Sequence, residues 1–185
     1  MRRTIQIGSA AKAAGWTVGL AIGTFVSTAA AEHVIEQPRA HPQYFAELEP
    51  HLSIGWIGPP GDGRGNGYGG GVLASFELVD PGFIPDLNNT VAISVGFDLL
   101  NYGYGDKETV RYAWIPVVMQ WNFFVASQWS VFGEPGLAIR VPSKGSSTLD
   151  PLIIRLGGRW HFTDNLAVTV RIGYPYATVG LSVLL

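Results

Sequence analysis

The chain has 185 residues and no cysteine, and its 12 Lys and Arg against 14 Asp and Glu give a formal net charge of −2 at pH 7. The lack of cysteine excludes disulfides, thiolate metal sites and a lipid-modified N-terminal cysteine, and the acidic balance argues against a nucleic-acid partner. Beyond residue 31 no stretch approaches the ~20 consecutive apolar residues that a transmembrane helix needs, which excludes a helical span there.

Residues 1–31 have the pattern of a cleavable secretory signal peptide. The segment holds three basic residues and no acidic one, residues 14–26 are apolar, and Ala29 and Ala31 form a small-x-small cleavage site. The alternative is a retained membrane anchor, which three glycines in this short apolar stretch disfavour. Removal of residues 1–31 leaves 154 residues (185 − 31), enough for one domain, with a net charge of 9 − 14 = −5.

Residues 32–43 are polar and interrupted by two prolines, which predicts a flexible lead-in. Over residues 44–185, alternating apolar and small or polar residues, separated by turn-rich segments, predict about eight β-strands. Their expected ranges are about 45–57, 68–79, 90–101, 110–123, 129–141, 152–161, 166–174 and 177–185. The range 110–123 is the least regular, and Pro116 within it predicts a β-bulge because proline cannot donate to a strand ladder.

The chemistry of the two strand faces indicates what surrounds these strands. Between residues 91 and 99, one face holds Val, Ile, Val, Phe and Leu, and the other holds Ala, Ser, Gly and Asp. A membrane barrel turns its apolar face to lipid and its small and charged residues to a narrow interior. An even number of strands in up-and-down order closes a barrel without free edges. The sequence therefore predicts an all-β fold, a single up-and-down antiparallel transmembrane β-barrel of about eight strands over residues 44–185.

Charged residues within the strands fall on the small-residue face. A basic side chain turned to lipid at the bilayer midplane would cost about 2–4 kcal/mol, and charges inside a narrow barrel must be paired. A salt-bridged plug is the main interpretation, and a gated pore or proton-coupled path is the alternative. The predicted interior charge network consists of Glu49, Glu77, Asp98, Glu134, Arg140, Arg155, Arg159 and Arg171.

Aromatic residues cluster where the predicted strands end. Two such bands match the interfacial girdles of a membrane barrel, because amphipathic rings suit the headgroup layer. The alternative is that they are ordinary core and turn residues. The predicted interfacial aromatics are Trp56, Tyr102, Tyr112, Trp121, Trp129, Phe162, Tyr174 and Tyr176.

The segment WHFTDNLAVTVRIGYPYATVGLSVLL (160–185), a turn, a hairpin and a closing strand, resembles the small bacterial outer-membrane β-barrels. That superfamily includes the OmpA transmembrane domain, OmpX and OmpW, and the resemblance spans about residues 44–185. It implies location in the bacterial outer membrane, with lipid and the barrel-insertion machinery as partners. The family usually ends in an aromatic residue read by that machinery, whereas this chain ends in Leu185.

The sequence predicts no catalytic, cofactor or metal site, since neither His51 nor His161 falls in a recognisable catalytic pattern. The expected function is a structural or surface-interaction role in the outer membrane without catalysis. The loops 58–67, 102–109 and 142–150 are the candidate contacts for an extracellular ligand. Two alternatives remain: a small pore or carrier for small or apolar solutes, and a soluble periplasmic lipocalin-like carrier of apolar ligands.

Overall fold

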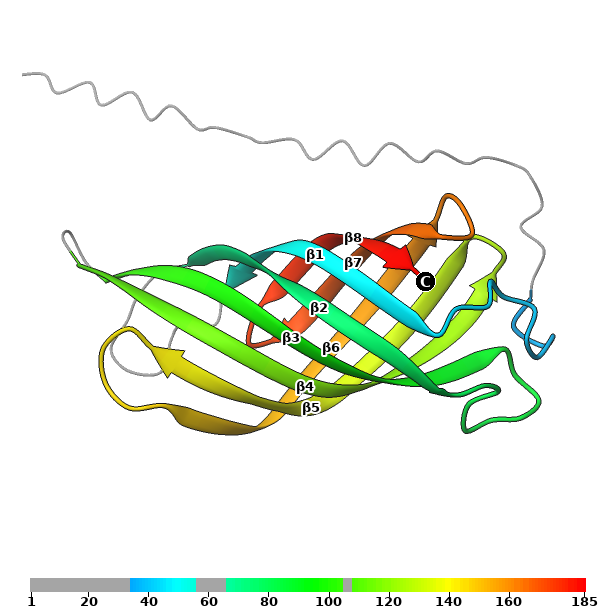
Figure 1. The fold of residues 1–185 in the computed structure, drawn as a ribbon, viewed down its shortest axis with the longest axis horizontal. Coiled ribbons are helices and arrows are strands. Elements are labelled where there is room, and N and C mark those ends of the chain that lie inside the picture. Colours follow the sequence, from blue (N-terminus) through cyan, green and yellow to red (C-terminus); the bar gives the residue numbers. More distant parts are fainter. Residues whose placement is uncertain (1–33, 56–65, 105–107) are drawn as a thin grey trace, which may run out of the picture.

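A computed structural model describes residues 34–55, 66–104 and 108–185. Each strand pairs antiparallel with the next, and the first pairs with the last, so the sheet closes into a barrel (Figure 1). This confirms the predicted eight-stranded up-and-down barrel. The strands are β1 (Ala46–Gly55), β2 (Gly67–Val79), β3 (Asn89–Tyr104), β4 (Glu108–Ala126), β5 (Trp129–Pro142), β6 (Thr148–His161), β7 (Leu166–Tyr174) and β8 (Ala177–Leu184). Within these residues no helix is long and apolar enough to cross a membrane.

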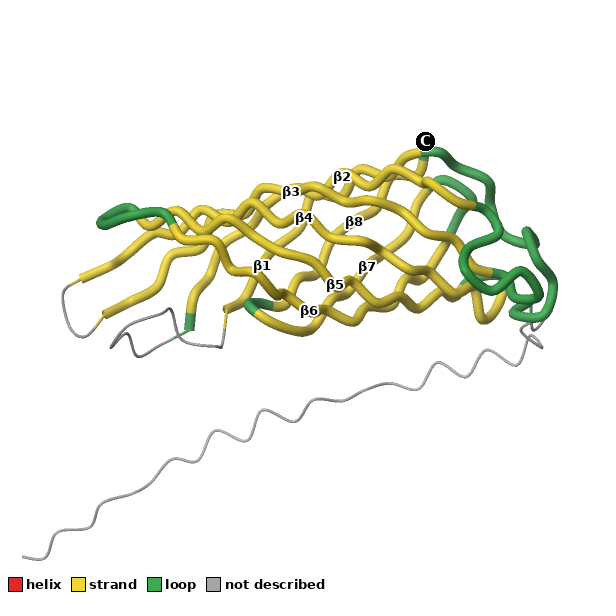
Figure 2. Tube along the Cα trace, turned by 90° about the horizontal axis from the view of Figure 1, so that it is seen from below, coloured by secondary structure: helices red, strands yellow, loops and turns green. Residues whose placement is uncertain are grey.

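The two ends of the barrel differ. The C-terminus and the segment before β1 lie at one end, here the terminal end, and the last residues of β1, β3, β5 and β7 lie toward the other, the loop end (Figures 1 and 2). The wall is uneven in height, because β4 has 19 residues whereas β8 has 8. β6 pairs with β7 only from Ile154 onward, so its first residues extend beyond the β7–β8 turn.

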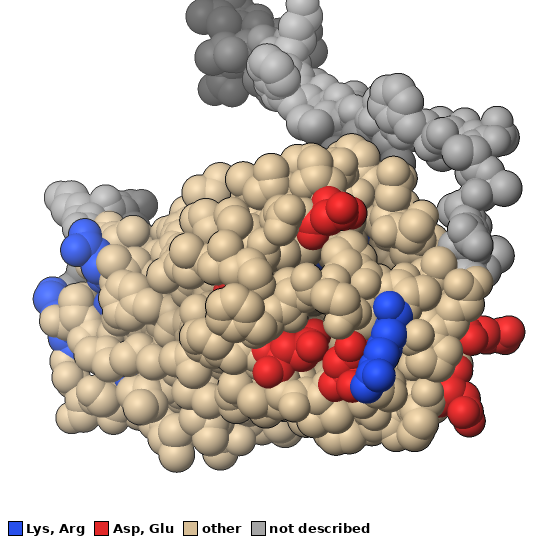
Figure 3. All heavy atoms as spheres, turned by 45° about the vertical axis from the view of Figure 1, so that its right-hand side comes forward, with Lys and Arg blue, Asp and Glu red and all other residues tan. Residues whose placement is uncertain are grey.

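The alternation of residues places apolar side chains outside and small or charged ones inside. Ile93, Val95 and Phe97 on β3 are 37–45% exposed, whereas Ser94 and Asp98, which alternate with them on the other face, are fully buried. On the face shown in Figure 3, charged side chains gather toward the two ends, mostly basic at the loop end and mostly acidic toward the terminal end. Between the two ends, exposed large apolar side chains on seven of the eight strands form an apolar belt.

Two details of the strands differ from the sequence-based expectation. No bulge occurs at Pro116, because the register with β3 is the same on both sides of it, and Gly96 opposite gives the proline ring room. Most of the expected loop 102–109 is strand, since β3 and β4 pair as far as Tyr104 and Glu108. Part of that loop and most of loop 58–67 lie outside the described residues, as does the predicted signal peptide.

The predicted flexible lead-in, described from residue 34, is docked on the terminal end. Val34 is buried, the Ile35 carbonyl accepts from the Asn88 backbone N–H at 2.8 Å, and the His41 ring stacks on Phe124 at 4.1 Å. Burial raises the pKa of the Tyr44 phenol, which follows this segment, and the nearby Arg159 guanidinium partly opposes that rise. The segment therefore covers part of the terminal end instead of projecting from it.

We expect Gly69→Ala to destabilise the barrel, because a Cβ at Gly69 would collide with the Leu99 carbonyl oxygen of the neighbouring strand. Overpacking of this kind costs about 1–3 kcal/mol. Gly103→Ala is the control, since a Cβ there meets nothing within 4 Å. The measurement is the temperature at which the folded form is lost on a gel run with and without heating, and equal temperatures for the two variants would contradict the expectation.

Candidate functional site in the barrel interior

A chain of buried ion pairs crosses the interior. Arg171 on β7 donates from Nε to both carboxylate oxygens of Glu134 on β5, at 2.9 and 3.1 Å, and from Nη1 to Glu49 on β1. Arg155 on β6 places Nη2 2.9 Å from Glu134 Oε2. All four side chains are at most 1% exposed. Glu134 therefore sits between two guanidiniums, and Arg171 sits between two carboxylates.

A second group of polar side chains lies nearer the terminal end. Arg159 donates from Nη2 to Glu47 Oε2 at 2.7 Å and from Nη1 to Asn122 Oδ1 at 3.3 Å. Gln120 connects the two groups, because it accepts from Arg159 at 3.3 Å and donates to Glu134 at 2.8 Å. The two groups of side chains thus form one connected network, to which β1, β4, β5, β6 and β7 contribute.

Phe132 on β5 separates this network from the barrel wall. Its ring lies 4.8 Å from the Arg159 guanidinium and 4.9 Å from that of Arg171, within the range of cation–π contacts. A Cβ at Gly157 on β6 would collide with the ring, so glycine at that position makes room for it.

Asp98 has partners other than arginine. It accepts hydrogen bonds from Ser53 at 2.9 Å and from the Tyr176 hydroxyl at 2.6 Å, and His51 Nε2 lies 2.6 Å away. His51 Nδ1 also lies 3.7 Å from Glu49 Oε1. His51 thus links the Asp98 cluster to the arginine network, and sequence reasoning missed it although it alternates with Glu49 and Ser53 on one strand face.

The structure brings together five residues of the predicted network, Glu49, Glu134, Arg155, Arg159 and Arg171, and Glu47 lies with them. Arg140 is apart from them, toward the loop end, where it pairs with Asp150 at 3.3 Å and stacks on Trp114 at 5.3 Å. Glu77 is half-buried at the terminal end, and within the described residues no arginine pairs with it. Glu77 lies near the end of β2, at the rim of the barrel, and is closer to the terminal end than the arginines are.

Three of the predicted interfacial aromatics lie inside the barrel instead. Tyr102, Tyr112 and Tyr176 are 1%, 7% and 1% exposed and form an apolar cluster with Leu100 and Trp114 in the loop-end half. Successive side chains of a strand point to opposite faces, and Leu99 on β3 faces outward. Tyr102 is three residues further along the same strand, so its side chain faces inward. A Cβ at Gly55 would collide with the Tyr102 hydroxyl, so the glycine provides its space.

The remaining interfacial candidates are placed as follows. Trp129 and Phe162 are 50% and 41% exposed near the terminal end, and half-buried Trp121 donates from Nε1 to Asn89 Oδ1 at 2.9 Å. Half-buried Tyr174 packs against the apolar cluster. Trp56 lies outside the described residues.

One serine and one histidine side chain are in contact in the interior, on β5 and β6. Ser130 Oγ lies 3.1 Å from His161 Nε2, but both side chains are buried, and within the described residues His161 Nδ1 has no hydrogen-bond partner to orient it. No group of three or more His, Asp or Glu in the described part of the chain could hold a metal ion. The arrangement is suited to bracing the barrel and blocking its interior.

Glu134→Gln should destabilise the barrel by about 3–5 kcal/mol, because it leaves two buried guanidiniums short of a counter-charge. Arg39→Ala is the control, since Arg39 is exposed and its 3.7 Å pair with Asp80 is of the surface kind, worth at most about 1 kcal/mol. Urea unfolding in lipid vesicles measures both. Equal midpoints would show that the network contributes little to stability.

No protein-family model matches the sequence, and no curated protein matches it. Among solved structures, the outer membrane protein Ail of Yersinia pestis in a phospholipid nanodisc has a TM-score of 0.47 and 11% identity, covering 77% of this chain and 100% of that one. A designed transmembrane β-barrel has a TM-score of 0.45 and 13% identity, covering 78% and 99%. Yersinia pestis Ail in complex with the heparin analogue sucrose octasulfate has a TM-score of 0.46 and 12% identity, covering 76% and 95%.

Proposed function

We propose that this chain is an integral β-barrel of the bacterial outer membrane with a filled interior and a structural or surface-interaction role, without catalysis. The observation that carries the proposal is the inverted polarity of the barrel. Buried ion pairs such as Arg171 with Glu49 and Glu134 lie inside, while the side chains outside are apolar. Such a surface suits hydrocarbon, where an exposed basic residue would cost about 2–4 kcal/mol at the midplane.

The orientation follows from the expected export signal together with the position of the chain ends. Both ends of the described barrel lie at the terminal end, so a chain entering from the periplasm leaves the loop end facing outward. The connections 58–67, 102–109 and 142–150 are then the surfaces available to an extracellular ligand. Outer-membrane lipid and the insertion machinery are the expected partners of the belt.

The two alternatives from the sequence fare differently. A soluble lipocalin-like carrier is wrong for this structure, because it needs Ile93, Val95 and Phe97 inside and the arginines in water. A pore needs an open path, whereas the ion pairs block the interior at one level and the tyrosine cluster fills it at another. A filled barrel therefore agrees better with the packing.

Fractionation tests the membrane assignment directly. We expect recovery in the outer membrane, with a gel mobility that changes on boiling, as for closed barrels. Ile93→Arg should abolish that recovery because it places a charge in the apolar belt, whereas Ser146→Arg in the exposed β5–β6 connection should not. Normal membrane assembly of Ile93→Arg would disprove the assignment of the faces.

Conductance in planar bilayers separates the filled barrel from a pore. The intact protein should show no stable ion-conducting steps, since buried ion pairs and the tyrosine cluster occupy the interior at two levels. A barrel with Arg155→Ala and Arg171→Ala together is the comparison, because it removes the two arginines on either side of Glu134. Steady conductance of the unaltered protein would favour the pore.

A further inference from the structure

The lipid-facing belt has a hollow centred on Gly133. In the register of the sheet, Trp121 lies opposite Gly133 on one side and Leu156 on the other. Gly133 falls on the outward face of β5, two positions from exposed Val131, and contributes no side chain there. A Cβ at this position would meet only Leu156 Cδ2, at 3.8 Å, so the space is open.

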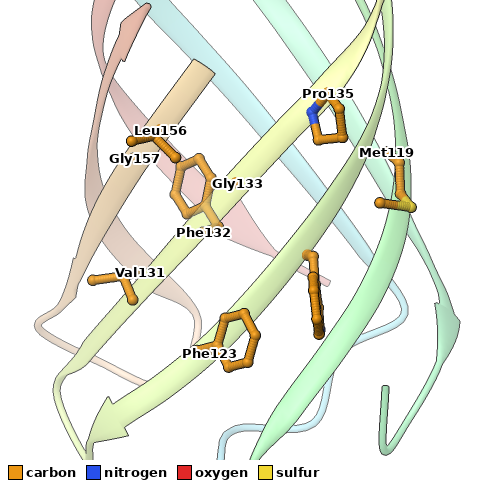
Figure 4. Close-up of a pocket in the computed structure, with 9 residues that line it drawn as sticks. Met119, Phe123, Val131, Phe132, Gly133, Pro135, Leu156 and Gly157 are labelled. Carbon is orange, nitrogen blue, oxygen red and sulfur yellow. The ribbon is translucent and has the colours of Figure 1, made fainter. Parts of the chain in front are cut away.

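The hollow has a volume of about 430 Å³ and an apolar rim. Phe123 and Val131 border it toward the terminal end, and Met119 and Pro135 border it on the opposite side (Figure 4). Its lining contains no charged residue. The floor includes Phe132, whose ring shields Arg159 and Arg171 from this side.

The position of the hollow along the barrel indicates which part of the membrane surrounds it. Gly133 is four residues along β5 from Trp129, about 13 Å along the strand and about 10 Å along the barrel axis at the usual strand tilt of about 40°. Trp129 is half-exposed at the terminal end, at the level expected for the membrane interface. Gly133 therefore lies within the hydrocarbon of the leaflet nearest the terminal end.

We propose that this hollow seats one acyl chain of an inner-leaflet phospholipid, an inference that rests on the proposed membrane location. The hollow is continuous with the lipid-facing belt, and its apolar lining offers water no hydrogen-bond partners. If left empty, the side chains around it would lose dispersion contacts on one side. An acyl chain running from the interface past Trp121 supplies those contacts.

The test uses the full-length protein in vesicles of phosphatidylethanolamine and phosphatidylglycerol containing a phosphatidylethanolamine with a diazirine in its acyl chain. After irradiation, mass spectrometry locates the labelled residues. We expect labelling of Met119, Trp121 and Leu156 severalfold above other belt residues such as Phe76 and Leu78 on β2, which are exposed and lie outside this hollow. Gly133→Leu should fill the hollow and reduce that excess severalfold, while leaving the labelling elsewhere unchanged.

Val72→Leu is the matched control, because it adds bulk to the belt on β2, two strands away from β4, where Met119 borders the hollow. Both variants must keep the mobility change on boiling. Even labelling around the belt, or a hollow that stays unlabelled because a second copy of the chain covers it, would overturn the acyl-chain site and leave the membrane location intact. Absence of label from the entire belt would instead overturn the proposed function.

Discussion

The requirement that buried charges be paired governs the interior of this barrel. Glu49, Glu134 and Arg171 come from three different strands. Each of these buried charges is paired with an opposite charge, without which it would be buried and unpaired. The glycines opposite make this possible. A Cβ at Gly180 would lie 2.7 Å from a Glu49 oxygen, and one at Gly71 would lie 2.6 Å from an Asp98 oxygen. The small residues of the inner face thus provide the volume that the carboxylates occupy.

The interior is divided into two chemically different layers. Toward the terminal end it is a charged network, and toward the loop end it is an aromatic cluster containing Tyr102 and Trp114. The Asp98 cluster joins the layers, because Tyr176 packs with the aromatic residues and donates its hydroxyl to the carboxylate. In the filled barrel that we propose, the charged layer would oppose the passage of apolar solutes and the aromatic layer the passage of ions.

The period-two pattern was enough to predict the strands, their order and which face of each turns inward, since lipid outside and charge inside impose different residues on alternate positions. It could not place Tyr102, Tyr112 and Tyr176, because an aromatic residue near a strand end suits both an interface and an apolar lumen. The docking of residues 34–43 depends on contacts such as His41 with Phe124, which lie far apart in the sequence. The pairing of Asp98 with His51 likewise required the register between strands.

Two of the ion pairs join nearly opposite ends of the chain. Arg159 and Glu47 are 112 positions apart, and Arg171 and Glu49 are 122 apart. Both acids belong to β1, the strand that must meet β8 to complete the cylinder. Until that seam forms, the guanidiniums on β6 and β7 lack the counter-charges that β1 brings. Contacts of such long sequence separation carry a large loop-closure cost, and the same closure of the seam that carries this cost brings the arginines their counter-charges. The acidic residues of β1 therefore favour the closed barrel over a half-open sheet, because in a half-open sheet Arg159 and Arg171 would lack these counter-charges.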